Sequence, residues 1–466
     1  MTRRKAVKKL LEVSIQNFDL KGQMISTFEE DKLLKINKLG ILPQDKLIAE
    51  VGRKRKGFYQ AYPKEILQKS PLAVEAKCRY FGECGGCRLQ NLDYEKQVFY
   101  KWQALRNLLD ESGFANLKLE EFILAENIFY YRNKMEFSFS PYKWYSEKPE
   151  ELPENDFALG FHAPSSFKKV LDLEECHLQS LESTEILKVV RKFALEKNLR
   201  PYDFEKHTGT LQFLIIKEGK FTKERLVNLV TSPIESEIFQ ELAERIAQAV
   251  PSTTGILHSI NETLSSAANL SRTTLLKGKE TIFEQIGDFK FKISASSFFQ
   301  ANTEQTKKLY SAIAEFGNFT GKEKVLDLYC GAGTISIFIA KLVERVIGIE
   351  IIPEAVEDAK FNAKLNGITN CDFFKGDVKD KLGERILKIA DVLILDPPRA
   401  GMHPKVLEKI LSVKPKKIIY VSCNPKSFVQ DLKSISQFYT VERMLPFDLF
   451  PHTPHSELLV ELKIKN

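Results

Sequence analysis

Hydrophobic and polar positions follow two alternating periods along the last third of the chain. From residue 296 onward, short apolar runs typical of buried strands are followed by segments with the 3.6-residue spacing of amphipathic helices. The strand-like runs are 325–329, 345–350, 371–376, 391–396 and 416–422, with two more near 439–446 and 457–464. The helix-like segments are 333–343, 353–366, 380–388, 404–412 and 426–434. This alternation predicts βαβ units and a parallel, Rossmann-like α/β sheet, in which ligands bind at the carboxyl ends of the strands.

The first 68 residues have a different pattern. Short strand-like runs at 9–18, 22–28, 32–38 and 45–51 predict a small, OB-like β-barrel. A basic stretch at 53–56 is followed by aromatic residues at 58, 59 and 62. Basic residues interleaved with aromatic ones suit single-stranded nucleic acid, although an inert β module with core aromatics would have the same pattern.

The segment between these regions, residues 69–295, is mixed. Helical spacing at 92–112 places Val98, Trp102, Leu105 and Leu109 on one face. Strand-like runs at 129–139, 157–161 and 210–217 and helical stretches near 182–197 and 234–249 predict an α+β domain. We therefore expect three domains, 1–68, 69–295 and 296–466, with helix 92–112 a candidate for packing on the third.

Composition and charge narrow the class of protein. The chain has 43% hydrophobic and 28% charged residues, and its net charge is +7. Residues 1–77 carry 17 Lys and Arg against 9 Asp and Glu, which suits a polyanion such as nucleic acid or, equally, a solvated charged face. No apolar run reaches the ~18 residues that span a bilayer, and no signal-peptide pattern is present. We expect a folded cytoplasmic protein without membrane contact.

A glycine-rich turn after the first strand of the last domain predicts a nucleotide-type site. Gly331 and Gly333 allow a ligand to approach the backbone, and Glu350, at the end of the next strand, can accept both hydroxyls of a ribose. The third glycine of a dinucleotide site is replaced by Ser336, and Asp327 before the turn would repel phosphate. S-adenosylmethionine, a cation without phosphates, fits better, although an ordinary turn between strand and helix remains the alternative.

Two further strand ends carry chemistry. Asp396 precedes two prolines, which force a rigid loop at the mouth of the site. Cys423 ends the following strand, and Pro425 allows a helix to begin there, whose N-terminus would lower the pKa of the thiol. Cys423 is therefore a candidate nucleophile, against the alternative of a small core residue. Glu457 is a candidate general base, and the nearby histidines suggest a metal site only weakly.

The cysteines predict a reducing environment and a metal. Cys78, Cys84 and Cys87 form a tight trio, and Cys176 is the remaining candidate for a fourth ligand. Zinc ribbons normally use two Cys-x2-Cys pairs, so this asymmetric spacing favours an iron–sulfur cluster, with zinc or no metal as alternatives.

These motifs together resemble the S-adenosylmethionine-dependent RNA uracil-5 methyltransferases, and among them the iron–sulfur branch that makes 5-methyluridine in 23S rRNA. The matching stretches are Cys-Arg-Tyr-Phe-Gly-Glu-Cys-Gly-Gly-Cys (78–87), Tyr-Arg-Asn-Lys (131–134), Ser-Phe-Phe-Gln-Ala-Asn (297–302), Asp-Leu-Tyr-Cys-Gly-Ala-Gly (327–333), Asp-Pro-Pro-Arg-Ala-Gly (396–401), Ser-Cys-Asn-Pro (422–425) and His-Thr-Pro-His-Ser-Glu (452–457).

The resemblance implies roles for individual residues. Cys423 would be the nucleophile and Glu457 the base. The ligands of the methyl donor would be Gln300, Tyr329, Glu350, Asp396, Asp377 and Thr334, the last of which stands where relatives often carry Asn. The resemblance also implies a [4Fe–4S] cluster and an RNA-binding barrel of the TRAM type.

The expected reaction transfers a methyl group to C5 of a uridine in RNA through a cysteine–C6 adduct, and a carboxylate then removes the C5 proton. The expected substrate is 23S rRNA rather than DNA, and the expected state is a monomer. The alternatives are a transfer-RNA substrate, an amino-group methyltransferase, which would have no use for Cys423 or Glu457, and a catalytically silent iron–sulfur RNA-binding protein.

Overall fold

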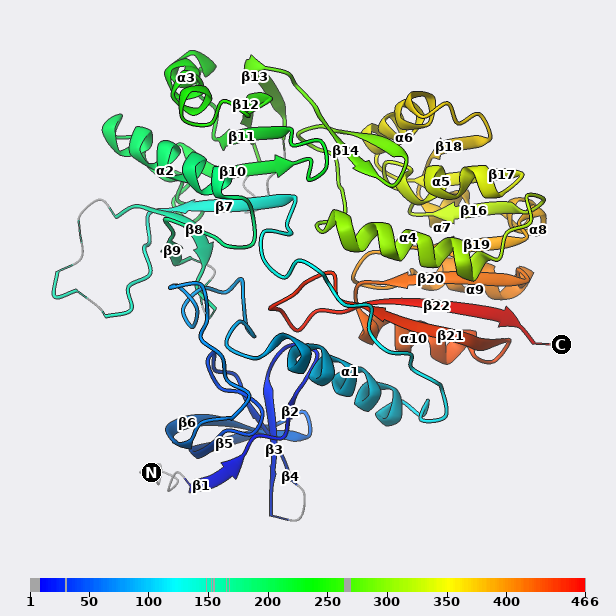
Figure 1. The fold of residues 1–466 in the computed structure, drawn as a ribbon, viewed down its shortest axis with the longest axis horizontal. Coiled ribbons are helices and arrows are strands. Elements are labelled where there is room, and N and C mark those ends of the chain that lie inside the picture. Colours follow the sequence, from blue (N-terminus) through cyan, green and yellow to red (C-terminus); the bar gives the residue numbers. More distant parts are fainter. Residues whose placement is uncertain are drawn as a thin grey trace.

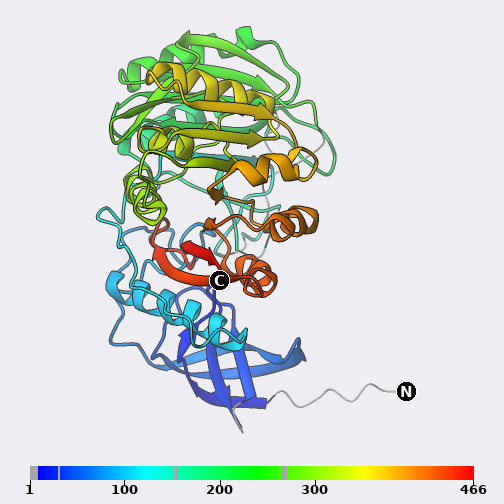
Figure 2. The ribbon, with the colours of Figure 1, turned by 90° about the vertical axis from the view of Figure 1, so that its right-hand side faces the viewer.

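The computed structural model describes residues 9–465 except 30–31, 148, 152, 154–155, 165, 167 and 264–269. Residues 1–8, which belong to the first domain predicted from the sequence, lie outside this range. Among the described residues the fold consists of three large sheets with their helices, one near the N-terminus, one in the middle of the chain and one at the end, and of a small two-stranded sheet (Figure 1). Seen from the side, the N-terminal sheet lies at one end of the elongated molecule (Figure 2).

The N-terminal region is a six-stranded sheet with the order β1-β5-β6-β4-β3-β2. Its inward positions form a separate apolar core around Phe18, Leu34 and Leu47. The basic stretch 53–56 is exposed at the turn between β5 and β6, so its charges face solvent. The strands are β1 Lys9–Ser14, β2 Asn17–Phe18, β3 Met24–Phe28, β4 Lys32–Ile36, β5 Lys46–Arg55 and β6 Phe58–Gln68.

The middle of the chain forms a seven-stranded sheet with the order β13-β12-β11-β10-β7-β8-β9, and helices α2 and α3 pack on it. The strand predicted at 129–139 begins only at Lys134, because Tyr130 adopts a positive φ of 56° and the preceding segment bonds to loops instead. The elements are β7 Lys134–Ser140, β8 Ala158–His162, β9 Val170–Asp172, α2 Leu181–Glu196, β10 Leu211–Glu218, β11 Arg225–Thr231, η1 Ser236–Phe239, α3 Gln240–Ala249, β12 Gly255–Ile260 and β13 Arg272–Gly278.

The hairpin of β14 (Ile282–Ile286) and β15 (Phe289–Ile293) leads into the C-terminal sheet, whose order is β18-β17-β16-β19-β20-β22-β21. Strands β16 to β20 are parallel, whereas β22 runs antiparallel between β20 and β21. The strands are β16 Lys324–Leu328, β17 Arg345–Glu350, β18 Cys371–Lys375, β19 Val392–Leu395, β20 Lys417–Ser422, β21 Tyr439–Phe447 and β22 Glu457–Ile464.

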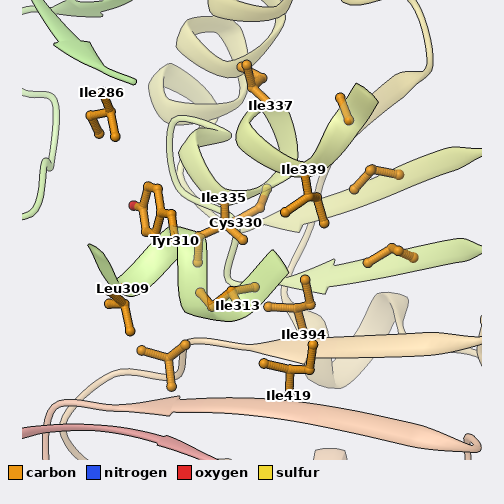
Figure 3. Packing of buried hydrophobic residues seen from close by; sticks show 14 of the residues in the cluster. Ile286, Leu309, Tyr310, Ile313, Cys330, Ile335, Ile337, Ile339, Ile394 and Ile419 are labelled. Carbon is orange, nitrogen blue, oxygen red and sulfur yellow. The ribbon is translucent and has the colours of Figure 1, made fainter. Parts of the chain in front are cut away.

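Helices cover the C-terminal sheet on both faces, as the sequence alternation predicts. Figure 3 shows one side of this core, where Leu309 and Ile313 of α4 and Ile335 of α5 pack over the sheet. The helix predicted at 380–388 is two short helices, α7 and α8, separated at Leu382 and Gly383. The helices are α4 Thr303–Gly317, α5 Thr334–Ile339, η2 Ala340–Leu342, α6 Pro353–Leu365, α7 Val378–Lys381, α8 Glu384–Ile389, α9 Pro404–Val413 and α10 Pro425–Ile435.

Helix α1 (Tyr94–Glu111) connects the N-terminal sheet to the C-terminal one. Asp93 caps it, since its side chain accepts a hydrogen bond from the Lys96 backbone. Its apolar residues Val98, Leu105 and Leu109 belong to the same buried cluster as the C-terminal sheet. In Figures 1 and 2 it lies between the N-terminal strands and strands β21 and β22. None of the helices among the described residues has the length and apolarity needed to cross a membrane.

Candidate active site

The candidate residues converge at one edge of the C-terminal sheet. Tyr329 follows β16, Glu350 ends β17, Asp396 follows β19 and Cys423 follows β20. These four strands are parallel neighbours in the sheet, so their carboxyl ends lie side by side. The site that the sequence predicts is therefore assembled at the edge where ligands bind in parallel α/β sheets.

The turn after β16 presents bare backbone to this edge. Gly331 has a φ of 53°, and a Cβ placed there would have no described heavy atom within 4 Å. At Gly333, with φ 75°, a Cβ would lie 2.8 Å from the ring of Phe373. The first glycine therefore leaves open space for a ligand, whereas the second allows the turn to pack on the protein.

The carboxylate of Glu350 is held in one orientation. Its Oε1 accepts hydrogen bonds from the backbone amides of Ile351 and Ile352 at 2.8 and 2.9 Å, and its Oε2 accepts one from Gly331 at 3.1 Å. The side chain is only 8% exposed. Because the carboxylate is fixed beside the open glycine, it is suited to receive the two hydroxyls of a ribose.

Asp327, which the sequence analysis used against a phosphate ligand but did not name as a donor ligand, is an acid in an unusual environment. It is fully buried, and its Oδ2 accepts a hydrogen bond from Ser336 Oγ at 2.5 Å. Its Oδ1 has no hydrogen-bond partner among the described residues. Burial raises the pKa of Asp327 to about 7. A buried acceptor without a donor fits a cationic ligand that brings its own N–H groups.

Asp396 and Gln300 come together from distant parts of the chain. Gln300 Nε2 lies 3.5 Å from Asp396 Oδ2, and the Gln300 carbonyl accepts a 2.7 Å bond from Asn133 Nδ2. Burial, reinforced by the charge of Asp327, raises the pKa of Asp396 to about 7. This acid also becomes fully charged only when a cation or a higher pH favours ionisation.

Two of the predicted donor ligands are already engaged within the protein. Thr334 Oγ1 lies 2.7 Å from the hydroxyl of Tyr310. Asp377 caps α7 by accepting a 3.0 Å bond from the Lys379 backbone, and it forms a 2.8 Å ion pair with the Lys379 side chain. Asp377 also faces Tyr329, whose pKa is raised to about 12 by burial and then by this carboxylate.

Cys423 and Glu457 are brought together by the reversed strand β22. In the antiparallel pair of β20 and β22, Ser422 lies opposite Leu458. Continuing this register by one residue places Cys423 opposite Glu457, and directly opposite residues point to the same face of a sheet. Two residues 34 positions apart in the sequence therefore lie side by side at the mouth of the site.

The environment of Cys423 differs from the sequence prediction. The helix beginning at Pro425 was expected to lower the pKa of the thiol, but burial, followed by the charges of Glu457 and Asp396, raises it to about 11. The charge of Arg399 acts in the opposite direction. This arginine is held nearby because its carbonyl accepts a 2.8 Å bond from the side chain of Asn424.

Glu457 has a strong affinity for a proton. It is 1% exposed, and its Oε1 has no hydrogen-bond partner in the described part of the chain. Burial, reinforced by Asp396, raises the pKa of Glu457 well above its usual range. A carboxylate with a raised pKa is a stronger base, which is what removal of a proton from carbon requires.

Known proteins share both the sequence and the fold. Residues 272–465 match the family described as tRNA (Uracil-5-)-methyltransferase. The chain is 38% identical over 453 residues to an uncharacterized RNA methyltransferase of Caldanaerobacter subterraneus subsp. tengcongensis, covering 97% of this chain and 98% of the relative. The chain belongs to the RNA uracil-5-methyltransferase family. An uncharacterized RNA methyltransferase of Chlorobaculum tepidum is 37% identical over 90% of this chain and 89% of its own length.

A solved structure extends the comparison. The methyltransferase described here is similar to the Pyrococcus abyssi tRNA (uracil-54, C5)-methyltransferase, which was crystallised with S-adenosyl-L-homocysteine. The two share 28% identity and a TM-score of 0.76 over 97% of this chain and 99% of the other. The predictions of an α/β methyltransferase fold, of S-adenosylmethionine as methyl donor and of an RNA-modifying enzyme are thereby confirmed.

The four predicted metal ligands of this methyltransferase line one pocket of about 290 Å³. Burial, reinforced by the other thiols, raises the pKa of Cys84 to about 12 and that of Cys176 to about 11. Gln90 accepts a 2.7 Å bond from the Cys78 backbone, and its amide lies 3.7 Å from Cys87 Sγ. Among the described residues, no three His, Cys, Asp or Glu side chains are placed to hold a single metal ion.

Arginines to which the sequence analysis assigned no role lie near the cysteine pocket and near His455. Arg132 lines the cysteine pocket, and its guanidinium also lies over the ring of Phe450 at 5.7 Å. Burial and the charges of Arg399, Arg132 and other basic groups lower the pKa of His455 to about 4. Basic side chains therefore lie around His455, two residues before Glu457, and such groups suit an RNA backbone.

Proposed function

We propose that this methyltransferase methylates C5 of a uridine in RNA through a covalent bond between Cys423 and C6. The observation that carries the proposal is the Ser422–Leu458 pair of β20 and β22, which brings the next residues, Cys423 and Glu457, together where Glu457 and Asp396 raise the pKa of the thiol. Uracil C5 is a poor nucleophile, and addition of a thiolate to C6 turns the ring into an enolate that reacts at C5. A uridine reaches such a site only after leaving its base stack, which single-stranded and loop RNA allow.

Each protein group has one task in this scheme. Cys423 adds to C6, and Arg399 favours the thiolate form. S-adenosylmethionine supplies an electrophilic methyl group, which C5 takes up. Glu457 then removes the C5 proton, so that the thiolate leaves and the aromatic ring returns. Because the pKa values of Cys423 and Glu457 are both raised, we expect the rate to increase as the pH rises above 7.

The donor site uses acids to bind a cation. The unpaired Oδ1 of Asp327 is suited to the ammonium group and Glu350 to the ribose, while Asp396 and Gln300 lie where the methyl group would face Cys423. Tyr329 has a positive φ of 65°, so it turns at the end of β16 and forms a side of the site. The contacts proposed for Asp377 and Thr334 are weaker, because both side chains already have partners in the protein.

We also propose that Cys78, Cys84, Cys87 and Cys176 hold a [4Fe–4S] cluster. The four thiols line a single pocket, and a four-iron cluster holds its ligands further apart than a single ion does. Methyl transfer moves no net electrons through the protein, so we propose a structural or RNA-positioning role for the cluster. Purification without oxygen, followed by measurement of iron, acid-labile sulfide and zinc, tests it, and a colourless product without iron would refute the cluster.

We propose ribosomal RNA as the substrate, with transfer RNA as the alternative. The cysteine quartet favours 23S rRNA, through the resemblance to the iron–sulfur branch, whereas the similarity to the Pyrococcus abyssi tRNA enzyme keeps transfer RNA as the second candidate. The exposed basic turn 53–56 supports a role for the N-terminal sheet as a TRAM-type RNA-binding module. Mass mapping of 5-methyluridine in ribosomal and transfer RNA, from cells with and without the protein, distinguishes the two substrates.

The covalent step has a direct test. RNA containing 5-fluorouridine carries no proton at C5, so after methyl transfer the adduct cannot break down and should survive denaturation. Cys423→Ser should abolish both the adduct and methylation, whereas Glu457→Gln should still form the adduct. An amino-group methyltransferase would form none, and a catalytically silent protein would bind RNA without transferring a methyl group.

A further inference from the structure

The loop before Glu457 begins and ends at two paired residues of the sheet. Phe447, the last residue of β21, pairs with Glu457, the first residue of β22, so residues 448–456 leave the sheet after Phe447 and return to it at Glu457. The position of this loop therefore determines where the Glu457 side chain begins. Residues that fix the loop are candidates for control of the deprotonation step.

His452, in the middle of the loop, is fixed by helix α1. The Gln97 side chain accepts a 3.0 Å bond from the His452 backbone amide, and its Nε2 lies 3.2 Å from His452 Nδ1. Both side chains are almost fully buried, at 1% and 2% exposure. Burial lowers the pKa of His452 to about 4, so the ring is neutral and its Nδ1 can accept the bond from Gln97.

The backbone of His452 is constrained as well. It has a φ of 66°, a conformation that a non-glycine residue adopts at an energetic cost and keeps only when its surroundings enforce it. Its carbonyl accepts bonds from the amides of Arg88 and Leu89 at 2.9 and 3.0 Å, and its ring packs against the tilted ring of Phe129 with 4.5 Å between centroids. The amide, the carbonyl and the ring are thus all held by residues outside the C-terminal sheet.

Hydrogen bonds within the loop also restrict the residues between His452 and Glu457. Thr453 donates to the Phe450 carbonyl through both its backbone amide, at 3.2 Å, and its hydroxyl, at 2.8 Å. The Thr453 hydroxyl accepts a 3.3 Å bond from the His455 amide, two residues before Glu457. Between His452 and Glu457 the chain therefore has little freedom to move.

We propose that Gln97 is a positioning residue for Glu457, which acts by locking His452 and with it the loop 448–456. The proposal rests on the proposed role of Glu457 as the base that removes the C5 proton. Gln97 touches neither RNA nor donor in this scheme, so its effect falls on the deprotonation step alone. Addition of Cys423 and methyl transfer precede that step and stay intact.

Gln97→Met tests the proposal because it removes both bonds to His452 and keeps an apolar side chain of similar length. A displacement of about 1 Å at a catalytic group costs on the order of 100-fold in rate, so we expect kcat to fall by roughly 10–100-fold with little change in KM for RNA or donor. The covalent complex with ordinary, unfluorinated RNA should accumulate during turnover, because its breakdown is slowed. Gln103→Met, on the same helix, is the matched control and should behave like the parent protein.

A second variant guards against a simple loss of folding. His452→Asn keeps a residue that tolerates positive φ and retains the backbone bonds, but it removes the ring that Gln97 contacts. It should accumulate the same covalent complex. Parental turnover in the Gln97→Met variant, or slow turnover in both variants without accumulation of the complex, would overturn the proposal. If Glu457→Gln itself formed no covalent complex with RNA, the proposed function rather than the role of Gln97 would fail.

Discussion

One ion pair at the start of the loop 448–456 allows a quantitative test. Lys101 of helix α1 donates a 2.7 Å bond to Asp448 Oδ1 and a 3.2 Å bond to the Phe450 carbonyl. Both charged side chains have 0% exposure. Burial lowers the pKa of Lys101, and Asp448 opposes that change. Removal of either residue would therefore leave a buried charge without its partner.

Lys101→Met removes the cation and keeps most of the side-chain volume. Asp448 is then a buried acid without its counter-charge, and breaking a buried pair in this way costs about 3–5 kcal/mol in the free energy of unfolding. For a cooperative unit of 150–250 residues, each kcal/mol lowers the melting temperature by about 2–4 °C. We therefore expect the C-terminal region to melt roughly 6–20 °C earlier.

Thermal unfolding followed by circular dichroism, with urea unfolding as a second probe, measures this loss. Lys96→Met, on the exposed side of the same helix, controls for removal of a lysine and should change little. The double variant Lys101→Met/Asp448→Asn removes the unpaired acid and should recover at least half of the loss. A loss of less than about 1 kcal/mol in the single variant, well below the 3–5 kcal/mol expected, or a double variant no more stable than the single one, would refute the reasoning.

Three further predictions concern the donor site. The pKa values of Asp327 and Asp396 are raised to about 7, so both acids ionise as the pH rises through 7, and affinity for the cationic donor should increase from pH 6 to pH 8. Calorimetry without RNA measures this change. S-adenosylhomocysteine, which keeps the ammonium group but lacks the sulfonium charge, should gain less. Gly333→Ala adds strain of about 1–3 kcal/mol at positive φ, so it should lower both donor affinity and melting temperature, and an unchanged affinity would contradict the packing. The buried Lys217 donates to three backbone carbonyls in 294–297 at 2.7–2.8 Å. Lys217→Met should raise KM for the donor more than KM for RNA, because that turn leads to the predicted donor ligand, and steady-state kinetics with each substrate varied separate the two effects.

Sequence periodicity predicted the C-terminal sheet well because strands and helices there alternate regularly. The break in the helix predicted at 380–388 depends on Gly383, whose effect a hydrophobic pattern does not record. The shortened strand at 129–139 also depends on information outside the local pattern, since the bonds of its first residues go to loops 46 or more positions away in the sequence. Local pattern therefore predicts which elements exist better than where they end.

The candidate site was also predicted only in part, because its residues have local signals but its long-range contacts do not. Cys423 and Glu457 were predicted from their motifs, but their adjacency requires β22 to insert next to β20 rather than outside β21, and no local signal contains that order. Gln97 and Lys101 were not predicted at all. Polar residues on a helix usually face solvent, and the partners of these two lie about 350 residues further along the chain. Only long-range contacts reveal that they face inward.

The reversed strand also bears on the proposed chemistry at carbon. In an all-parallel sheet only the carboxyl ends of strands reach the ligand-binding edge. Uracil C5 needs a thiolate to activate the ring and a base to remove a proton afterwards. Because β22 runs antiparallel, its first residue, Glu457, lies at that edge, one position beyond the Ser422–Leu458 pair and therefore next to Cys423. In the proposed mechanism the sheet would set the spacing of Cys423 and Glu457, and the loop 448–456, held by helix α1, would orient the carboxylate.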